Sequence, residues 1–105
     1  MKQLTKEKAI AYFNERAPKA LREKGIETIE EYFFRNPENK DDEGTTLFVI
    51  NKVYMIRYII PEAFNCFMRN QRFKPTLRGC KAIGTSPIKR LIKVWTERGW
   101  LREVR

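Results

Sequence analysis

Apolar and polar residues recur with helical spacing near the start of the chain. Apolar side chains between positions 9 and 13 follow Thr5, whose hydroxyl suits the N-cap of a helix. This pattern predicts a helix over residues 5–16. A second, shorter helix is expected over residues 19–24, because a proline precedes this segment and a glycine follows it.

A third helical segment is predicted directly after these two. Thr28 is followed three residues later by Glu31, which is the spacing of a capping box. Ile29, Tyr32 and Phe33 then fall at helical spacing and would form the apolar side. Residues 1–35 are therefore expected to be helical in two or three short pieces.

The middle of the chain changes from a polar loop to a continuous apolar run. Residues 36–45 are rich in turn formers and carboxylates, which is typical of a surface loop. Residues 46–60 are dominated by β-branched and aromatic side chains, and Asn51 with Lys52 interrupts them. The run is apolar on both sides, so its period does not separate a strand from a buried helix. We favour a β-hairpin that turns at Asn51 and Lys52.

The C-terminal third is predicted to hold three helices and a strand. Pro61 suits the start of a helix over residues 61–71, and Thr76 suits the cap of a short helix over residues 76–83, with Cys80 on its apolar side. Ser86 and Pro87 are typical of the start of a further helix, over residues 87–98. Residues 100–104 are then expected to extend as a strand that pairs with the segment 46–60.

The helix over residues 87–98 has two chemically different sides. Ile88, Leu91, Ile92 and Trp95 recur at intervals of three and four residues and form an apolar stripe. Lys89, Arg90 and Lys93 fall on the opposite side. The pattern therefore predicts one side that packs and one cationic side that faces outward.

This C-terminal stretch resembles the winged helix-turn-helix DNA-binding domains. The resemblance covers about thirty residues and rests on the sequence IKRLIKVWTERGWLREV, in which a helix of this apolar spacing ends at a glycine and leads into a strand. It implies that residues 87–98 are the recognition helix, that residues 99–104 enter the wing, and that Cys80 allows two helices to cross closely. The fold class expected is α+β: a single, mostly helical, winged-helix-like domain with a small β-sheet.

Basic residues are concentrated in the C-terminal part of the chain. The net charge is +9, and residues 61–105 carry 11 basic and 3 acidic side chains, which leaves +1 for residues 1–60. Such asymmetry favours a local site for a polyanion over a generally basic surface. A cationic face that meets only solvent is the alternative.

The resemblance and the charge together predict a DNA-binding protein, with duplex DNA as the expected partner. Arg90 is the expected base contact, since its planar guanidinium group can donate two hydrogen bonds to the N7 and O6 atoms of guanine. The residues expected to contact nucleic acid are Arg78, Lys81, Thr85, Ser86, Lys89, Arg90, Lys93, Arg102 and Arg105. The role expected is that of a small transcription regulator or of an accessory factor of a replicating or mobile element. The resemblance also implies a homodimer.

Two other functions fit the same residues. One is binding of single-stranded nucleic acid, with Phe73, Trp100 or Tyr58 as a platform on which bases stack. The other is a protein-interaction module, an adaptor or inhibitor, whose basic face meets an acidic protein partner. Its interface would use the aromatic residues of the N-terminal part, which are Tyr12, Phe13, Tyr32, Phe33 and Phe34.

The composition argues against several other functions. The chain has no histidine, and its two cysteines are isolated, so neither a zinc site nor any other metal site or cofactor is expected. It also carries no phosphate-binding loop or nucleophile motif, and we do not expect an enzyme. No apolar run reaches the length of a membrane span and no leader is evident, so a cytoplasmic location is expected.

Overall fold

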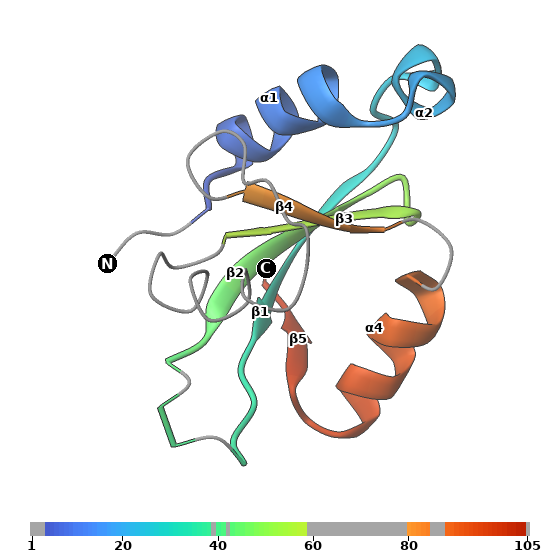
Figure 1. The fold of residues 1–105 in the computed structure, drawn as a ribbon. Helices are drawn as coiled ribbons and strands as arrows, with labels where there is room; N and C mark the ends of the chain where they lie inside the picture. Colours follow the sequence, from blue (N-terminus) through green and yellow to red (C-terminus); the bar gives the residue numbers. More distant parts are fainter. Residues whose placement is uncertain (1–3, 39, 42, 59–79, 85–87, 105) are drawn as a thin grey trace, which may run out of the picture.

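The computed structural model describes residues 4–38, 40–41, 43–58, 80–84 and 88–104, and the fold is α+β (Figure 1). Its centre is an antiparallel sheet of five strands in the order β4-β3-β2-β1-β5. The strands are β1 (Ile29–Phe34), β2 (Thr45–Ile50), β3 (Tyr54–Tyr58), β4 (Cys80–Gly84) and β5 (Leu101–Glu103). The helices are α1 (Lys6–Arg16), α2 (Lys19–Lys24) and α4 (Ile88–Glu97).

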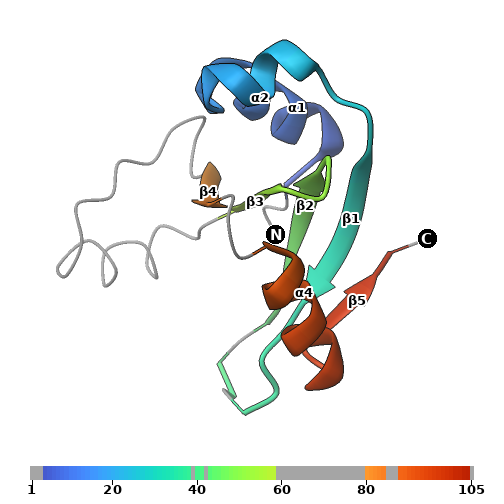
Figure 2. The ribbon, with the colours of Figure 1, turned by 90° about the vertical axis from the view of Figure 1, so that its right-hand side faces the viewer.

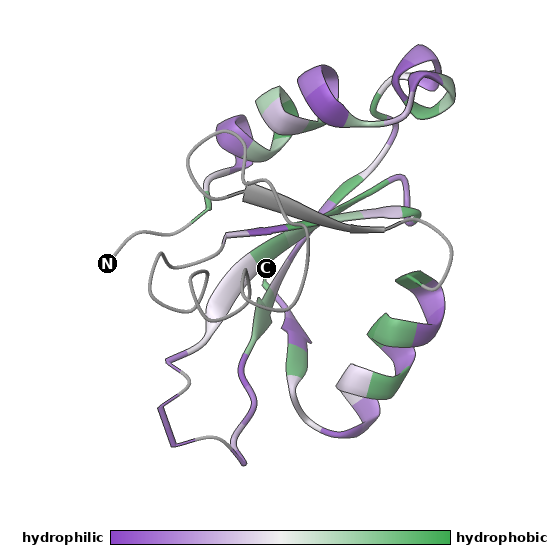
Figure 3. Ribbon diagram, viewed as in Figure 1, coloured by the Kyte–Doolittle hydropathy of each residue, from purple (hydrophilic) through white to green (hydrophobic). Residues whose placement is uncertain are grey.

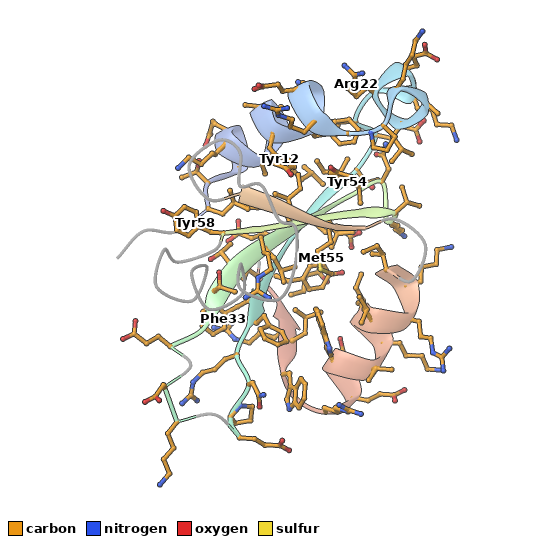
Figure 4. All side chains as sticks on the ribbon, in the orientation of Figure 1. Tyr12, Arg22, Phe33, Tyr54, Met55 and Tyr58 are labelled. Carbon is orange, nitrogen blue, oxygen red and sulfur yellow. The ribbon has the colours of Figure 1, made fainter. Side chains whose placement is uncertain are left out.

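The sheet lies between two helical layers, with α1 and α2 on one side and α4 on the other (Figures 1 and 2). Each side has its own apolar core, because successive residues of a strand point to opposite faces. On the α1 side, Phe13 is buried against Phe48, Tyr54 and Ile56. Tyr12 and Tyr54 lie between α1 and the sheet in Figure 4.

The second core lies between the sheet and α4. Its buried members are Tyr32, Leu47, Val49, Met55, Ile88 and Leu101. Hydrophobic residues of α4 lie along the side toward the sheet and hydrophilic ones along the other (Figure 3). The sheet therefore holds α4 in place through an apolar contact and leaves its polar side outward.

Several predicted elements are confirmed. Helices α1, α2 and α4 lie within one or two residues of their expected bounds, and the Thr5 hydroxyl accepts a hydrogen bond of 3.2 Å from the Lys8 N–H, as an N-cap does. The hairpin of β2 and β3 and the C-terminal strand β5 are also present. The helix predicted over residues 61–71 lies outside the described residues.

The helix predicted from residue 28 is wrong, because this segment forms the strand β1. Tyr32 and Phe34 point to the α4 side, whereas Ile29 points to the α1 side. Strand β1 pairs with β2 along its whole length and with β5 at its C-terminal end, so it lies inside the sheet. Hydrogen bonding on both edges outweighs the local capping-box signal.

The C-terminal strand has a different partner from the one expected. Strand β5 pairs with β1, with Tyr32 opposite Glu103 and Phe34 opposite Leu101, and not with the segment 46–60. The second edge of β2 is already occupied by β1. The sheet is accordingly larger than predicted, and the mostly helical character of the prediction is not confirmed.

The short helix predicted over residues 76–83 is also wrong where the structure describes it. Residues Cys80–Gly84 form β4, which pairs with β3. Within the described residues, α4 is thus preceded by an edge strand and not by the first helix of a helix-turn-helix. The expected role of Cys80 as the small residue between two crossing helices is wrong for the same reason.

The turn between β2 and β3 holds two neighbouring parts of the chain together. The Val53 N–H donates to the Ile50 carbonyl at 3.1 Å, and both central residues of this turn have positive φ, 52° at Asn51 and 61° at Lys52. The Asn51 side chain accepts hydrogen bonds from the Glu27 and Thr28 N–H groups at 2.7 and 2.9 Å. It therefore fixes the start of β1 beside the turn.

Replacing Lys52 with glycine is expected to stabilise the protein by about 0.5–1 kcal/mol. A left-handed backbone costs an L-residue about 1–2 kcal/mol, which exceeds the extra entropy that glycine loses on folding. Lys52 is exposed, so few contacts are lost. Urea unfolding would measure the change. Lys52→Ala is the control, because it keeps the strained φ, and an equal gain from both variants would contradict the explanation.

Candidate nucleic-acid interface

Helix α4 is the element on which the candidate site depends. Ile88 at its start is fully buried, and Ile92 and Trp95 pack against the core between α4 and the sheet. Three residues at this spacing cover one side of a helix. The direction of the opposite side is thereby fixed by the sheet.

The outward side of α4 is cationic. Lys89, Arg90 and Lys93 are all exposed, and none of them forms an ion pair with another described residue. The acidic residue of α4 is Glu97, in its last turn, and Glu30 of β1 lines the same hollow as Lys89. Side chains on this side of α4 extend into solvent (Figure 4). We call Lys89, Arg90 and Lys93 the α4 cationic face.

The corner between α4 and β5 forms a second feature. Gly99 has a φ of 78°, a value that favours glycine and ends the helix. The Trp100 N–H then donates to the Trp95 carbonyl at 2.8 Å, and the Trp100 carbonyl accepts from the Arg35 N–H at 2.9 Å. These hydrogen bonds hold the corner against the end of β1.

Two arginines at this corner stack on aromatic rings. The Arg98 guanidinium carbon lies 5.0 Å from the centre of the Trp100 ring, and that of Arg102 lies 5.2 Å from the centre of the Phe33 ring. Phe33 and Arg102 are directly opposite each other in the pairing of β1 with β5. Phe33 is labelled on the sheet in Figure 4.

A cavity of about 190 Å³ opens beside these rings. We call it the corner pocket, and its lining residues are Phe33, Arg35, Pro37, Gly99, Trp100 and Arg102. Among the residues that the structure describes, the lining combines two aromatic rings with two guanidinium groups and has no carboxylate. Such a lining suits a flat, negatively charged ligand.

A shallower hollow of about 340 Å³ lies between α4 and the sheet, and its lining has mixed charge. It is lined by Glu30, Tyr32, Lys52, Lys89 and Ile92. The Tyr32 hydroxyl donates to Glu30 Oε2 at 3.2 Å, and burial, followed by the Glu30 and Glu103 carboxylates, raises the pKa of Tyr32 to about 12. The phenol is therefore neutral at physiological pH. Because carboxylate and ammonium groups share this lining, we do not include it in the nucleic-acid interface.

The structure places five of the expected binding residues on α4 and in the segment that directly follows it. Lys89, Arg90 and Lys93 form the α4 cationic face, and Trp100 and Arg102 line the corner pocket. Lys81 is on β4, at the opposite edge of the sheet from β5, so it does not join them. The other expected positions, Phe73, Arg78, Thr85, Ser86 and Arg105, lie outside the described residues.

Two expectations about aromatic residues are wrong. Tyr58 is 6% exposed, so it is not an open stacking platform. Tyr12, Phe13 and Tyr32 are buried in the two cores, which removes most of the aromatic surface expected for a protein-interaction module.

Phe33, Arg35 and Arg98 were not predicted as nucleic-acid contacts, although Phe33 was named for the interface of the alternative protein-interaction module. Phe33 was expected on the apolar side of a helix, and residues 29–34 do not alternate between apolar and polar side chains, so no local signal places it in a strand. Among the described residues, no group of three or more potential ligands is arranged to hold a metal ion. Nor does any described helix have the length and apolarity needed to cross a membrane.

No protein-family model, curated protein or solved structure matches this chain at a significant level. A proposal about its function therefore depends on the geometry and charge described above.

Proposed function

We propose that the protein binds nucleic acid, with duplex DNA as its main ligand, through the α4 cationic face. The observation that carries the proposal is the set of three exposed cations on one side of a helix whose other side is fixed to the sheet. Because the sheet fixes the helix, the lysines and arginine on its exposed side are presented together and can meet several phosphates along a groove. The excess of positive charge in residues 61–105 also favours binding of a polyanion.

The helix geometry supports a contact with the DNA groove. An α-helix with its side chains fits the major groove of B-DNA, and Lys89, Arg90 and Lys93 are exposed within two turns of α4, with Lys89 at the border of the hollow between α4 and the sheet. Arg90 is the proposed base contact, and Lys89 and Lys93 are the proposed phosphate contacts. The biological role that we propose is that of a small regulator or of an accessory factor of a replicating or mobile element.

The test is salt-dependent binding by a triple variant in which Lys89, Arg90 and Lys93 become alanine. Each lost phosphate contact should reduce the slope of log K against log salt by about 0.9, and the variant should bind a labelled 20-base-pair duplex about a hundredfold more weakly at 100 mM salt. Fluorescence anisotropy between 50 and 300 mM NaCl would measure both quantities.

The matched control removes three cations from α2, which lies on the other side of the sheet. Lys19, Arg22 and Lys24 are exposed, and their replacement by alanine changes the net charge by the same amount. This control should keep most of the affinity and the slope. An equal loss in both triple variants would show that only net charge matters, and no binding at 50 mM NaCl would overturn the proposal.

A further inference from the structure

We infer that the corner pocket binds a single unpaired nucleotide, with the base against its aromatic rings and the phosphate at its arginines. The inference deepens the proposed function and rests on it, since it places an unpaired nucleotide beside a duplex held by the α4 cationic face. The protein would then prefer a duplex that ends in a single-stranded overhang over a blunt duplex.

The size and the aromatic lining of the pocket fit a base. Its volume is about 190 Å³, and a cavity of about 150 Å³ is known to hold a benzene ring. The Trp100 ring is held by Phe34, whose ring centre lies 6.2 Å away at an interplanar angle of 86°. Gly44 lies so close to the Phe33 ring that an added Cβ would overlap it. Rings held in this way can stack with a base without first becoming ordered.

The Arg102 guanidinium in the lining of the pocket fits a phosphate. Its central carbon lies 5.2 Å from the centre of the Phe33 ring, and a guanidinium that contacts a ring in this way keeps N–H groups available for an anion. The Arg98 guanidinium, whose carbon lies 5.0 Å from the centre of the Trp100 ring, is near the pocket but is not among its described lining residues. Phosphate is favoured over a carboxylate ligand because the neighbouring rings would also stack with its base.

The position of the pocket explains why we expect one nucleotide and not a long single strand. Gly99 and Trp100 directly follow α4, so the pocket lies beside the C-terminal end of that helix, whereas Phe33 and Arg102 line it from the face of the sheet opposite α4. Pro37, which lines the pocket, is followed in the chain by the exposed carboxylate of Glu38, and Glu43 is exposed in the same loop. These charges would repel a strand that continued beyond the pocket.

The first experiment measures tryptophan fluorescence with the oligonucleotide (dT)4 and with an abasic tetramer of the same charge. The chain has two tryptophans, so W100F and W95F form a matched pair. A stacked base should quench the fluorescence of the wild type and of W95F but not that of W100F. The abasic tetramer should bind at least about fivefold more weakly, because base stacking is lost. Equal affinity for both oligonucleotides, or quenching that persists in W100F, would overturn the inference.

The second experiment compares a blunt duplex with the same duplex carrying a two-nucleotide overhang. The wild type should bind the overhang duplex at least about fivefold more tightly, and R102Q should reduce this ratio toward one. The control is K8Q, which also removes a cation stacked on a ring, that of Tyr58, away from the corner pocket. A wild-type ratio of one, or an equal fall of the ratio in R102Q and K8Q, would overturn the inference.

The two proposals fail in different ways. Loss of the overhang preference with normal binding of the blunt duplex would reject the pocket and keep the α4 cationic face. Base-dependent quenching by (dT)4 without any binding of a blunt duplex would reject the proposed duplex function and keep the pocket. A tetra-aspartate peptide tests whether the pocket recognises the base or only the charge. If this peptide binds the pocket as tightly as (dT)4 does and so removes the quenching by (dT)4, the pocket is an anion site without base recognition. That result would overturn the inference.

Discussion

Between pH 10 and pH 12 the protein is expected to lose up to about 5 kcal/mol of its free energy of unfolding, because two buried tyrosines resist ionisation in the folded state. The pKa of Tyr32 is raised from 10.0 to about 12 by burial and by the carboxylates of Glu30 and Glu103. The pKa of Tyr54 is also raised from 10.0 to about 12, mainly by burial. The two side chains are 8% and 4% exposed.

The direction of this pH dependence of stability follows from the number of protons that each state binds. Above pH 10 the unfolded chain loses the two phenolic protons while the folded protein keeps them, so stability falls as the pH rises toward 12. Below pH 10 the contribution is complete. Guanidinium unfolding at pH 9.5 and 11.5 would measure the loss.

The control for this prediction is the double variant Y32F/Y54F. It lacks the phenolic hydroxyls of Tyr32 and Tyr54 and is otherwise unchanged. The wild type should therefore lose several kcal/mol more than the double variant over the same pH interval. Equal losses would show that the two phenols ionise in the folded protein as easily as in the unfolded chain.

The helices were predictable because their signals are local. The Thr5 cap and the apolar spacing of α1 and α4 depend on residues only a few positions apart, and the expected bounds 87–98 compare with Ile88–Glu97 in the structure. The turn at Asn51 and Lys52 was predictable for the same reason. The direction of the α4 cationic face then follows from helix periodicity alone.

The strands β1 and β4 were not predictable from local patterns. Thr28 and Glu31 match a capping box, but the hydrogen-bond partners of residues 29–34 are in β2 and β5, in distant parts of the chain. Residues 80–84 do not alternate strictly between apolar and polar residues, and their pairing with β3 decides their structure. In both segments a non-local ladder of hydrogen bonds outweighs a weak local preference for helix.

The corner pocket depends on one of these missed strands. Arg102 reaches the Phe33 ring only because β5 pairs with β1, and Trp100 lies beside Phe34 for the same reason. A helix over residues 28–33 would have separated these side chains. The cations of the proposed duplex contact were therefore visible in the sequence, whereas the pocket proposed for an unpaired nucleotide became visible only in the structure.

Replacing Ile88 with alanine is expected to lower the free energy of unfolding by about 4 kcal/mol, within the range of 2–5 kcal/mol typical of such core substitutions. Ile88 is fully buried, and it packs in the core between α4 and the sheet with Val49 and Met55, which are also 0% exposed. Central strands cannot easily move to fill the space, so a cavity should remain. Urea unfolding would measure the loss.

Thr96→Ala is the control for Ile88→Ala, because Thr96 is exposed on the same helix and its replacement should change stability by less than about 0.5 kcal/mol.

The Ile88→Ala variant also tests whether DNA binding depends on the attachment of α4 to the sheet. At a temperature where this variant is still mostly folded, its affinity for duplex DNA should fall only if α4 leaves the sheet. A loss of affinity that parallels the loss of α4 amide protection in hydrogen exchange would link the α4 cationic face to its attachment. A stable Ile88→Ala protein would instead mean that the contact between α4 and the sheet contributes little, and the rigid presentation of the three cations would lose its physical basis.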